Sequence, residues 1–311
     1  MRKKGSKAVV QNADSISLNK YISDTGFCSR READNYINQG RVTINERPAI
    51  LGNRVSDTDV VEVDGEPIKK KIKTVYIACN KPVGVTCTTD RKDPDNIVDY
   101  LRHPQRIFPV GRLDKDSDGL IFLTNDGNIV NKILRAGNNH EKEYIVVVDQ
   151  PITKEFIDKM GNGVPILNTI TQKCKVVQEG KSAFRITLIQ GLNRQIRRMC
   201  LALNYKVVHL KRVRVMNVHL GNLPSGHWRY LTPEEIGLIN KMVADSSHTE
   251  EASKPKPKPA PVKAIVQQEE TAAPAAKKAT TGRKESVRPV PPKRVTSYKD
   301  FRVKGVKKKK G

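Results

Sequence analysis

The first patterned region of the chain predicts two short helices that share a buried face. Ser17 precedes an apolar run over residues 18–23, and Gly26 follows the run as a stop signal. Ser29 and Glu32 have the Ser-x-x-Glu spacing of a capping box, in which each side chain satisfies a free backbone N–H at the helix start. The apolar positions after this box fall on one helical face: Ala33, Tyr36 and Ile37.

Alternating apolar residues then predict short strands. One pair is Val42 and Ile44, and a second is Val61 and Val63, which a turn at Asp64-Gly65 follows. Two helices and a few strands are enough for a small α+β core. Its basic residues lie off the buried helical face, where we expect contacts with phosphate groups: Lys20, Arg30, Arg31 and Arg41.

The longer central region mixes strand-like and helix-like patterns without strict alternation. β-Branched runs predict strands at residues 75–79, 144–148 and 184–189, and apolar spacing predicts helices over 126–136 and 193–203. Thr232-Pro-Glu-Glu235 predicts the start of a last helix, with a capping box and a proline at the first helical position. This mixture favours an α+β fold with a mixed, largely antiparallel sheet.

Composition divides the chain into four segments. Three lysines at 69–71 separate a small unit at 15–73 from a larger one at 74–245. Residues 246–311 hold 18 Lys+Arg and 6 Asp+Glu but few large apolar side chains, so we expect a disordered basic tail rich in lysine and proline. Residues 1–14 are expected to be a disordered N-terminus.

The charge of the whole chain indicates a polyanionic partner. It has 57 Lys+Arg against 33 Asp+Glu, a formal net charge of +24, and lysines and arginines that neutralise phosphates gain affinity by releasing counterions. Nucleic acid is favoured over membrane, because neither a long apolar span nor a long basic amphipathic helix is visible. The five cysteines form no Cys-x-x-Cys pair, which fits a reduced, cytoplasmic protein without a zinc site.

Three aspartates at alternate positions allow two interpretations. Asp114, Asp116 and Asp118 precede Gly119 with the spacing of a calcium-binding EF-hand loop. However, the twelfth loop position is Asn125 rather than glutamate, and the following residues look like a strand instead of a helix. The alternative keeps one aspartate as a catalyst and assigns the others to the loop.

Several motifs resemble known families. Leu18-Asn-Lys-Tyr-Ile, Ser29-Arg-Arg-Glu-Ala-Asp and Gly40-Arg-Val-Thr-Ile-Asn resemble the RNA-binding domain named after ribosomal protein S4. Four motifs resemble pseudouridine synthases of the RsuA/RluB/RluE/RluF group: Asn80-Lys-Pro-Val-Gly84, Gly111-Arg-Leu-Asp114, Lys142-Glu-Tyr144 and Gly191-Leu-Asn-Arg-Gln-Ile-Arg197. The resemblance is strongest to the branch that acts on large-subunit ribosomal RNA.

This resemblance implies a role for each matching residue. Asp114 is expected to be the nucleophile, Arg197 its ion-pair partner, and Tyr144 the ring that stacks on a flipped uracil and relays a proton. Further basic residues of these motifs are expected to contact RNA: Lys81, Arg112, Arg194 and Arg198. Neither a cofactor nor a metal is implied, because uridine isomerisation needs no external group.

The expected partner is large-subunit ribosomal RNA, transfer RNA is the candidate for a second substrate, and the default state is a monomer. Small-subunit RNA stays open as an alternative. So does a non-catalytic basic protein of ribosome assembly, which explains the charge equally well. It does not explain why Asp114, Tyr144 and Arg197 stand in matching motifs.

Overall fold

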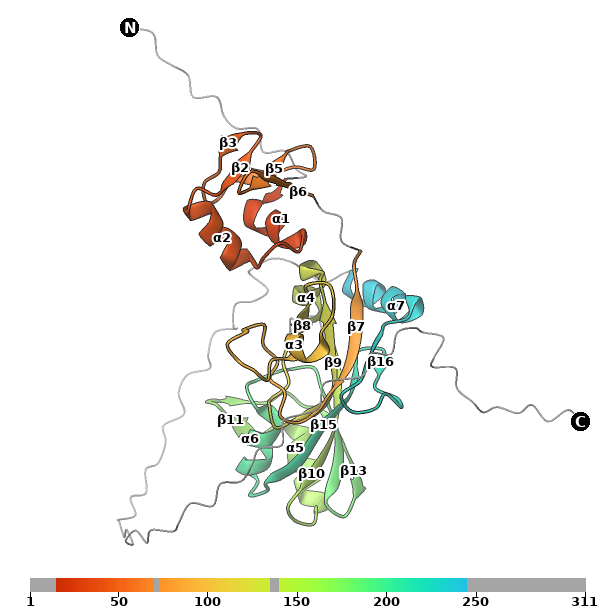
Figure 1. Cartoon of the computed structure of the whole chain (residues 1–311). Helices are drawn as coiled ribbons and strands as arrows, with labels where there is room; N and C mark the ends of the chain where they lie inside the picture. Colours follow the sequence, from red (N-terminus) through yellow and green to blue (C-terminus); the bar gives the residue numbers. More distant parts are fainter. Residues whose placement is uncertain (1–14, 70–72, 135–139, 245–311) are drawn as a thin grey trace, which may run out of the picture.

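The computed structural model describes residues 15–69, 73–134 and 140–244, which form two units in succession along the chain (Figure 1). The segments predicted to be disordered, 1–14 and 246–311, lie outside these residues. Among the helices of the described ranges, none combines the length and the apolar character that a membrane crossing requires.

The first unit packs two helices against a small antiparallel sheet. Helices α1 (Leu18–Asp24) and α2 (Arg30–Asn38) contribute Leu18, Ile22 and Ala33 to its buried core. The four-stranded sheet has the order β3-β2-β5-β6. The strands of this sheet are β2 (Val42–Ile44), β3 (Arg47–Pro48), β5 (Val61–Val63) and β6 (Glu66–Ile68). A separate two-stranded sheet pairs β1 (Ile16–Ser17) with β4 (Arg54–Val55).

Local signals in this unit are confirmed with one exception. Ser29 accepts a hydrogen bond from the Glu32 backbone N–H at 3.2 Å, and the Glu32 carboxylate accepts one from the Ser29 N–H at 2.7 Å, so the capping box is complete. The predicted turn between β5 and β6 contains Asp64 and Gly65, both with positive φ. Ser17 occupies the N-cap position of α1, but its side chain makes no capping hydrogen bond.

The second unit is built on a nine-stranded mixed sheet. The strand order is β13-β14-β10-β15-β9-β7-β17, with β8 paired to β9 and β16 paired to β15. Only the β9–β15 pairing is parallel; the others are antiparallel. The strands are β7 (Tyr76–Lys81), β8 (Phe108–Val110), β9 (Asp118–Thr124), β10 (Lys142–Val148), β13 (Lys175–Gly180), β14 (Ala183–Leu188), β15 (Val207–Val215), β16 (Val218–His219) and β17 (Trp228–Tyr230). The predicted α+β class with a largely antiparallel sheet is confirmed.

Helices and one short hairpin complete this unit. They are α3 (Ile97–Leu101), α4 (Gly127–Leu134), α5 (Lys154–Asn162), α6 (Gln195–Ala202) and α7 (Pro233–Ala244), with the hairpin of β11 (Pro165–Ile166) and β12 (Thr169–Ile170). The predicted capping box at α7 is present, because Thr232 and Glu235 exchange backbone-to-side-chain hydrogen bonds of 2.9 and 3.1 Å.

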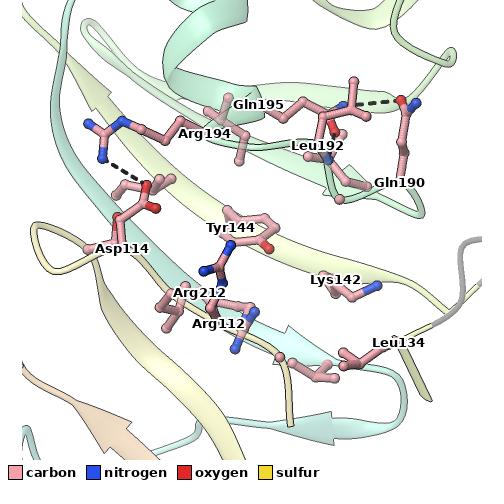
Figure 2. Close-up of a pocket in the computed structure, with 18 of the residues that line it drawn as sticks. Arg112, Asp114, Leu134, Lys142, Tyr144, Gln190, Leu192, Arg194, Gln195 and Arg212 are labelled. Carbon is pink, nitrogen blue, oxygen red and sulfur yellow. Dashed lines mark hydrogen bonds and ion pairs between the residues drawn. The ribbon is translucent and has the colours of Figure 1, made fainter. Parts of the chain in front are cut away.

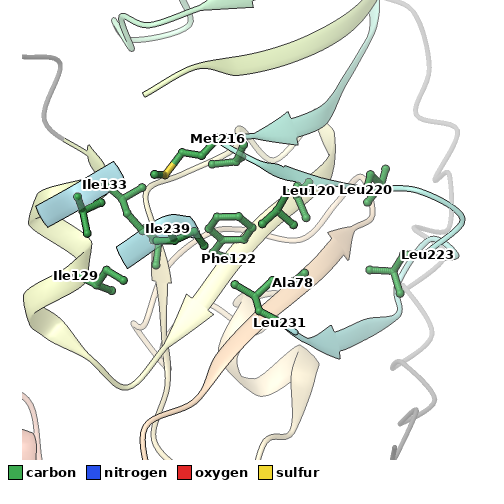
Figure 3. Close-up of a cluster of buried hydrophobic side chains, with 14 residues drawn as sticks. Ala78, Leu120, Phe122, Ile129, Ile133, Met216, Leu220, Leu223, Leu231 and Ile239 are labelled. Atoms are coloured by element: carbon green, nitrogen blue, oxygen red, sulfur yellow. The ribbon is translucent and has the colours of Figure 1, made fainter. Parts of the chain in front are cut away.

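Each half of the sheet has its own hydrophobic core. Figure 3 shows the core around β7 and β9, where Phe122 packs with Ile129 of α4 and Ile239 of α7. In the other half, Phe184 of β14 packs with Phe156 of α5, whose rings lie 5.3 Å apart, and with the buried face of α6. Strand β15 lies between the two halves, and its parallel contact with β9 joins them.

Two elements differ from the sequence prediction. Helix α6 begins at Gln195 rather than at residue 193, because Arg194 adopts a left-handed backbone conformation (φ 49°, ψ 37°). Strand β15 was not predicted, since four of its nine residues are His, Lys or Arg and obscure the apolar alternation.

Candidate active site

A cavity of about 410 Å³ opens where the two halves of the sheet meet (Figure 2). Its walls come from the loop of residues 110–117 before β9, from β10 and β15, and from the segment 188–196 that leads into α6. This volume falls within the range of roughly 300–1,000 Å³ for small-molecule sites. The cavity is therefore large enough for one nucleotide unit.

Asp114 stands in the loop that forms one side of this cavity. Its side chain is 32% exposed, so the carboxylate is open to the cavity without lying in bulk water. Its Oδ2 atom lies 3.1 Å from Nη1 of Arg194 and 3.9 Å from Nε of Arg197. Two guanidinium groups therefore place positive charge beside this carboxylate.

Arg197 fixes the loop that carries Asp114. Its side chain is only 13% exposed, and its Nη2 donates hydrogen bonds to the Asp116 carbonyl at 3.0 Å and to Ser117 Oγ at 3.1 Å. It also lies 3.3 Å from the Asp116 carboxylate. The predicted meeting of Arg197 with Asp114 is thus present in the structure, although most of the Arg197 contacts are with the next residues of the loop.

Arg194 is the nearer partner of Asp114. It also donates two hydrogen bonds, of 3.1 and 3.0 Å, to the two carboxylate oxygens of Asp116, and these bonds lower the pKa of Asp116. The sequence prediction assigned Arg194 to phosphate and gave the Asp114 ion pair to Arg197. The structure shows both pairs and adds Arg194 as the nearer one, with its guanidinium engaged by two carboxylates; its contact with phosphate stays a prediction.

Tyr144 lies on β10, and its ring faces the cavity (Figure 2). It is half-buried and packs against two clusters, the core around Phe184 and a further cluster of the β7–β9 half that contains Ile77 and Trp228. Its cross-strand partners are Ile186 on β14 and Arg212 on β15. Asp114 and Tyr144 therefore line one cavity with Arg197 behind the loop, as the motifs led us to expect, and Arg194 lines the same cavity without having been predicted there.

Sequence reasoning missed two basic residues of the cavity, Lys142 and Arg212. Lys142 precedes Tyr144 by two residues on the same strand, a spacing that puts two side chains on one face and could have indicated it. Burial, together with the nearby Arg212, lowers the pKa of Lys142 to about 8. Arg212 belongs to β15, the strand that the apolar pattern did not reveal.

Lys81, predicted to touch RNA, is completely buried, so this prediction is wrong. Its ammonium group donates hydrogen bonds to the carbonyls of Pro82 and Val85 at 2.9 and 2.8 Å, and burial lowers its pKa. It therefore braces the loop after β7. Arg112, in contrast, is exposed and lines the cavity. Arg198 is also exposed, and it donates to the Asn193 carbonyl at 3.1 Å.

The basic residues of the first unit differ in how far they are engaged. Arg41 makes a two-pronged ion pair with Asp64, at 2.7 and 2.6 Å, and lies 4.2 Å above the Tyr36 ring. Lys20 pairs with Asp24 at 2.6 Å. Arg30 and Arg31 are exposed on the first turn of α2, with their side chains at the surface.

The three aspartates of the loop do not converge on a common centre. Asp114 and Asp116 face arginines, whereas Asp118 lies 2.7 Å from Nε2 of His209 on β15. In the described part of the chain, no group of three His, Cys, Asp or Glu side chains is arranged as metal ligands.

Comparison with known proteins agrees with this geometry. The family model of RNA pseudouridylate synthases matches residues 75–202, and that of the S4 domain matches residues 17–61. The Escherichia coli (strain K12) protein named dual-specificity RNA pseudouridine synthase RluF is 54% identical over 274 residues, 87% of this chain and 94% of the relative. The Salmonella typhi protein of the same name is 56% identical over 268 residues, 84% of this chain and 93% of its own length.

More distant relatives are also pseudouridine synthases by name. The Bacillus subtilis ribosomal large subunit pseudouridine synthase B is 35% identical over 234 residues, which is 72% of this chain and 96% of that protein. A solved structure described as a crystal structure of pseudouridylate synthase has a TM-score of 0.54 and 28% identity, and covers 72% of this chain and all of its own.

The chain therefore belongs to the family of RNA pseudouridine synthases, with an N-terminal S4 domain ahead of the catalytic domain. Within that family it is an enzyme of the RluF type, from the RsuA group that the motifs indicated.

Proposed function

We propose that the enzyme isomerises uridine in large-subunit ribosomal RNA and in a second class of RNA, for which transfer RNA is our candidate. The similar bacterial proteins named RluF are described as dual-specificity enzymes, and the Bacillus relative is named for the large ribosomal subunit. The five cysteines are all free thiols, which suits work beside RNA in a reducing cytoplasm.

We further propose that the target uridine leaves its stack and enters the cavity, where the ring of Tyr144 stacks on the uracil. Enzymes that act on a base inside folded RNA must expose it first, and aromatic side chains hold the exposed base. The observation that carries this proposal is the Asp114 carboxylate, held 3.1 Å from Arg194 at the wall of a nucleotide-sized cavity that Tyr144 also lines.

Asp114 is the proposed reacting group. Attack at C1′ of the ribose, attack at C6 of the base, and removal of the 2′ proton all require an ionised carboxylate in contact with the nucleotide. Arg194 and Arg197 supply the compensating positive charge and keep the loop in place. Tyr144 is positioned to accept the proton that must leave.

Replacement of the carboxylate tests this assignment. We expect Asp114→Asn to abolish tritium release from RNA labelled at C5 of uridine, since the amide neither attacks nor accepts a proton. Binding of the same RNA should persist within about threefold, because the change does not remove a positive charge. Asp126→Asn, in the turn before α4, is a matched control outside the cavity. Activity in Asp114→Asn, with deamidation excluded by mass spectrometry, would refute the proposal.

The choice of RNA is tested separately. Carbodiimide mapping of pseudouridine in ribosomal and transfer RNA, from cells with and without the gene, should reveal one modified position in large-subunit RNA and at least one in transfer RNA. The alternative of a non-catalytic assembly protein predicts identical maps. It is disfavoured by the arrangement of Asp114, Arg194 and Tyr144 around one cavity.

A further inference from the structure

The cavity contains basic side chains that have no role in the function proposed above. Among the lining residues, Asp114 is the only acidic one, whereas four are basic: Arg112, Lys142, Arg194 and Arg212. Arg194 is paired with carboxylates. Neither Lys142 nor Arg212 forms an ion pair with any residue that the structure describes between positions 15 and 244. Like charges that share a partly buried site are costly unless an anion joins them.

Arg212 is held rigidly at the floor of the cavity. Its side chain is only 4% exposed, and its Nε donates a hydrogen bond of 2.6 Å to the Leu120 carbonyl. The backbone is fixed as well, because Arg212 pairs with Gly119 so closely that a Cβ atom on Gly119 would lie 2.2 Å from the Arg212 carbonyl oxygen.

The terminal amines of Arg212 are left for a ligand. They have no hydrogen-bond partner among the described residues, and Figure 2 shows the guanidinium lying beside Tyr144, inside the cavity. A guanidinium anchored through Nε still presents the four N–H donors of its two NH2 groups in a fixed plane.

Lys142 adds a second cation to this floor. Its ammonium group donates to the carbonyls of His140 and Ile189 at 3.0 and 3.4 Å, which leaves one of its three N–H donors for a ligand. Lys142 and Tyr144 lie on one face of β10, and Arg212 is the cross-strand partner of Tyr144. The two cations therefore flank the ring on which the uracil is proposed to stack.

The depth of Arg212 and Lys142 in the cavity indicates which part of a bound nucleotide they contact. The phosphates of a flipped nucleotide stay with the RNA strand at the mouth of the cavity, where Arg112 is exposed, while the base enters furthest. A buried guanidinium beside Tyr144 therefore faces the base. Uracil is neutral in the substrate, so the anion in question must arise during the reaction.

Two of the three proposed routes, attack at C1′ and removal of the 2′ proton, generate such an anion, and the inference below applies to them. When the N1–C1′ bond breaks, both bonding electrons stay on the base and give a uracil anion whose charge is shared with its carbonyl oxygens. C5 then forms the new bond to C1′ with an electron pair of that anion. If Asp114 has attacked C1′, the Asp114–C1′ bond breaks and the carboxylate leaves; if the 2′ proton was removed, C2′ regains a proton. C5 loses its proton, and N1 gains one. Atoms and electrons balance without a co-reactant.

We propose that Arg212 and Lys142 form an anion-stabilising site for the detached uracil ring, with Arg212 as a further catalytic residue of the enzyme. This inference rests on the proposed entry of the base into the cavity. Donors placed where charge develops strengthen most in the transition state, so they act on turnover rather than on binding of the RNA.

The test measures single-turnover rates and apparent affinities of the full chain on ribosomal RNA from cells that lack the gene. We expect Arg212→Gln to lower the rate about 10²–10³-fold, with the half-saturating RNA concentration within about threefold of wild type. Arg212→Lys should recover part of the rate, and Lys142→Gln should lower it about tenfold. Lys211→Gln, one residue away but outside the cavity, is the matched control and should behave as wild type.

A change of leaving group separates charge stabilisation from a structural effect. Fluorine at C5 of uracil withdraws electrons and stabilises the anion, so the defect of Arg212→Gln should shrink at least severalfold on RNA that contains 5-fluorouridine. Because fluorine replaces the C5 proton, the reaction on this base stops after C5 bonds to C1′, and its rate is followed as loss of 5-fluorouridine by nucleoside chromatography. Equal defects on both RNAs, or wild-type rates, would overturn the proposal.

A phosphate contact would look different. It would weaken RNA binding, reduce the salt dependence of affinity by about one charge, and leave the rate unchanged; that result also overturns the proposal. If Arg212→Gln fails to fold, Lys142→Gln carries the same comparison of the two bases. Asp114→Asn is measured in parallel, because activity there refutes the proposed function, whereas a defect there with normal Arg212→Gln refutes only this inference.

Discussion

At the scale of single residues, sequence motifs located the proposed reacting groups better than the partners of those groups. Asp114, Tyr144 and Arg197 stand in short motifs whose spacing is visible in the sequence, and the structure brings them to one site. The role of Arg194 was not predictable, because helical spacing assumes that residue 194 lies in the helix. Its left-handed backbone instead turns the side chain toward Asp114. Arg212 was missed for a different reason, since its contacts cross more than ninety residues of sequence.

The first prediction at this scale concerns the pH dependence of stability at Lys142. Its charged neighbour is Arg212 on β15, and a second titratable neighbour is His140 before β10, whose own pKa burial lowers. Burial, together with Arg212, lowers the pKa of Lys142 to about 8, from 10.5 in the unfolded chain. Between these two values only the unfolded chain holds the proton, so this residue makes stability rise with pH. Below about pH 8 its charge destabilises the fold.

Lys142→Met removes this titration. We expect the variant to gain stability relative to wild type most at pH 7, and the gain to shrink as the pH rises from 8 toward 10. Urea unfolding across this range measures the difference. Lys154→Met, at the exposed start of α5, is the control, and its difference in stability from wild type should not change with pH. A difference for Lys142→Met that also stays constant with pH would contradict the lowered pKa of Lys142.

At the scale of elements, capping signals and β-branched runs were reliable where one element could be read alone. The boxes at Ser29 and Thr232 are present in the structure. What the sequence did not reveal is how elements distant in the chain pair. The contact of β9 with β15 depends on a close approach of two backbones, and a glycine in the sequence does not tell which strand it will meet.

Gly119 is the residue on which this contact depends. Its φ is +103°, and an added Cβ would lie 2.2 Å from the Arg212 carbonyl oxygen, a backbone atom that cannot yield without displacing β15. We expect Gly119→Ala to cost about 3 kcal/mol or more in free energy of unfolding, since strain and steric overlap add. The rate per folded molecule should also fall, because Arg212 moves with β15 when that strand is displaced.

The control for this prediction is Gly127→Ala at the start of α4. An added Cβ there meets nothing within 4 Å, and alanine favours the helix, so stability should stay equal or rise slightly. Chemical denaturation of both variants gives the comparison. A Gly119→Ala protein as stable as wild type would show that β9 and β15 are less closely packed than described.

At the scale of the whole molecule, charge predicted the kind of partner and motif order predicted the sequence of domains. The S4 domain and the catalytic domain were both recognisable because each carries its own motifs. The exact boundaries, 15–73 and 74–245, stay predictions. Which RNA is bound depends on loops and surfaces whose placement no short pattern encodes.

The basic tail carries the last prediction. Residues 246–311 hold 18 basic and 6 acidic side chains, so their removal should weaken RNA binding and reduce its salt dependence by several charges. The single-turnover rate at saturating RNA should stay within about twofold, because no cavity residue is lost. Filter binding between 50 and 300 mM salt, compared with a deletion of residues 1–14, measures this. An unchanged salt slope would leave the tail without a part in RNA binding.

The parallel contact between β9 and β15 has a consequence for how this enzyme is put together. Asp114 lies in the loop before β9, in one half of the second unit; Tyr144 lies on β10, in the other half; and Arg212 lies on β15, the strand that joins them. Neither half contains all the residues that we propose to take part in the reaction, although each has a hydrophobic core of its own. Activity therefore depends on the pairing of the two halves. A fragment that folds as one half alone would lack residues that the isomerisation of uridine requires.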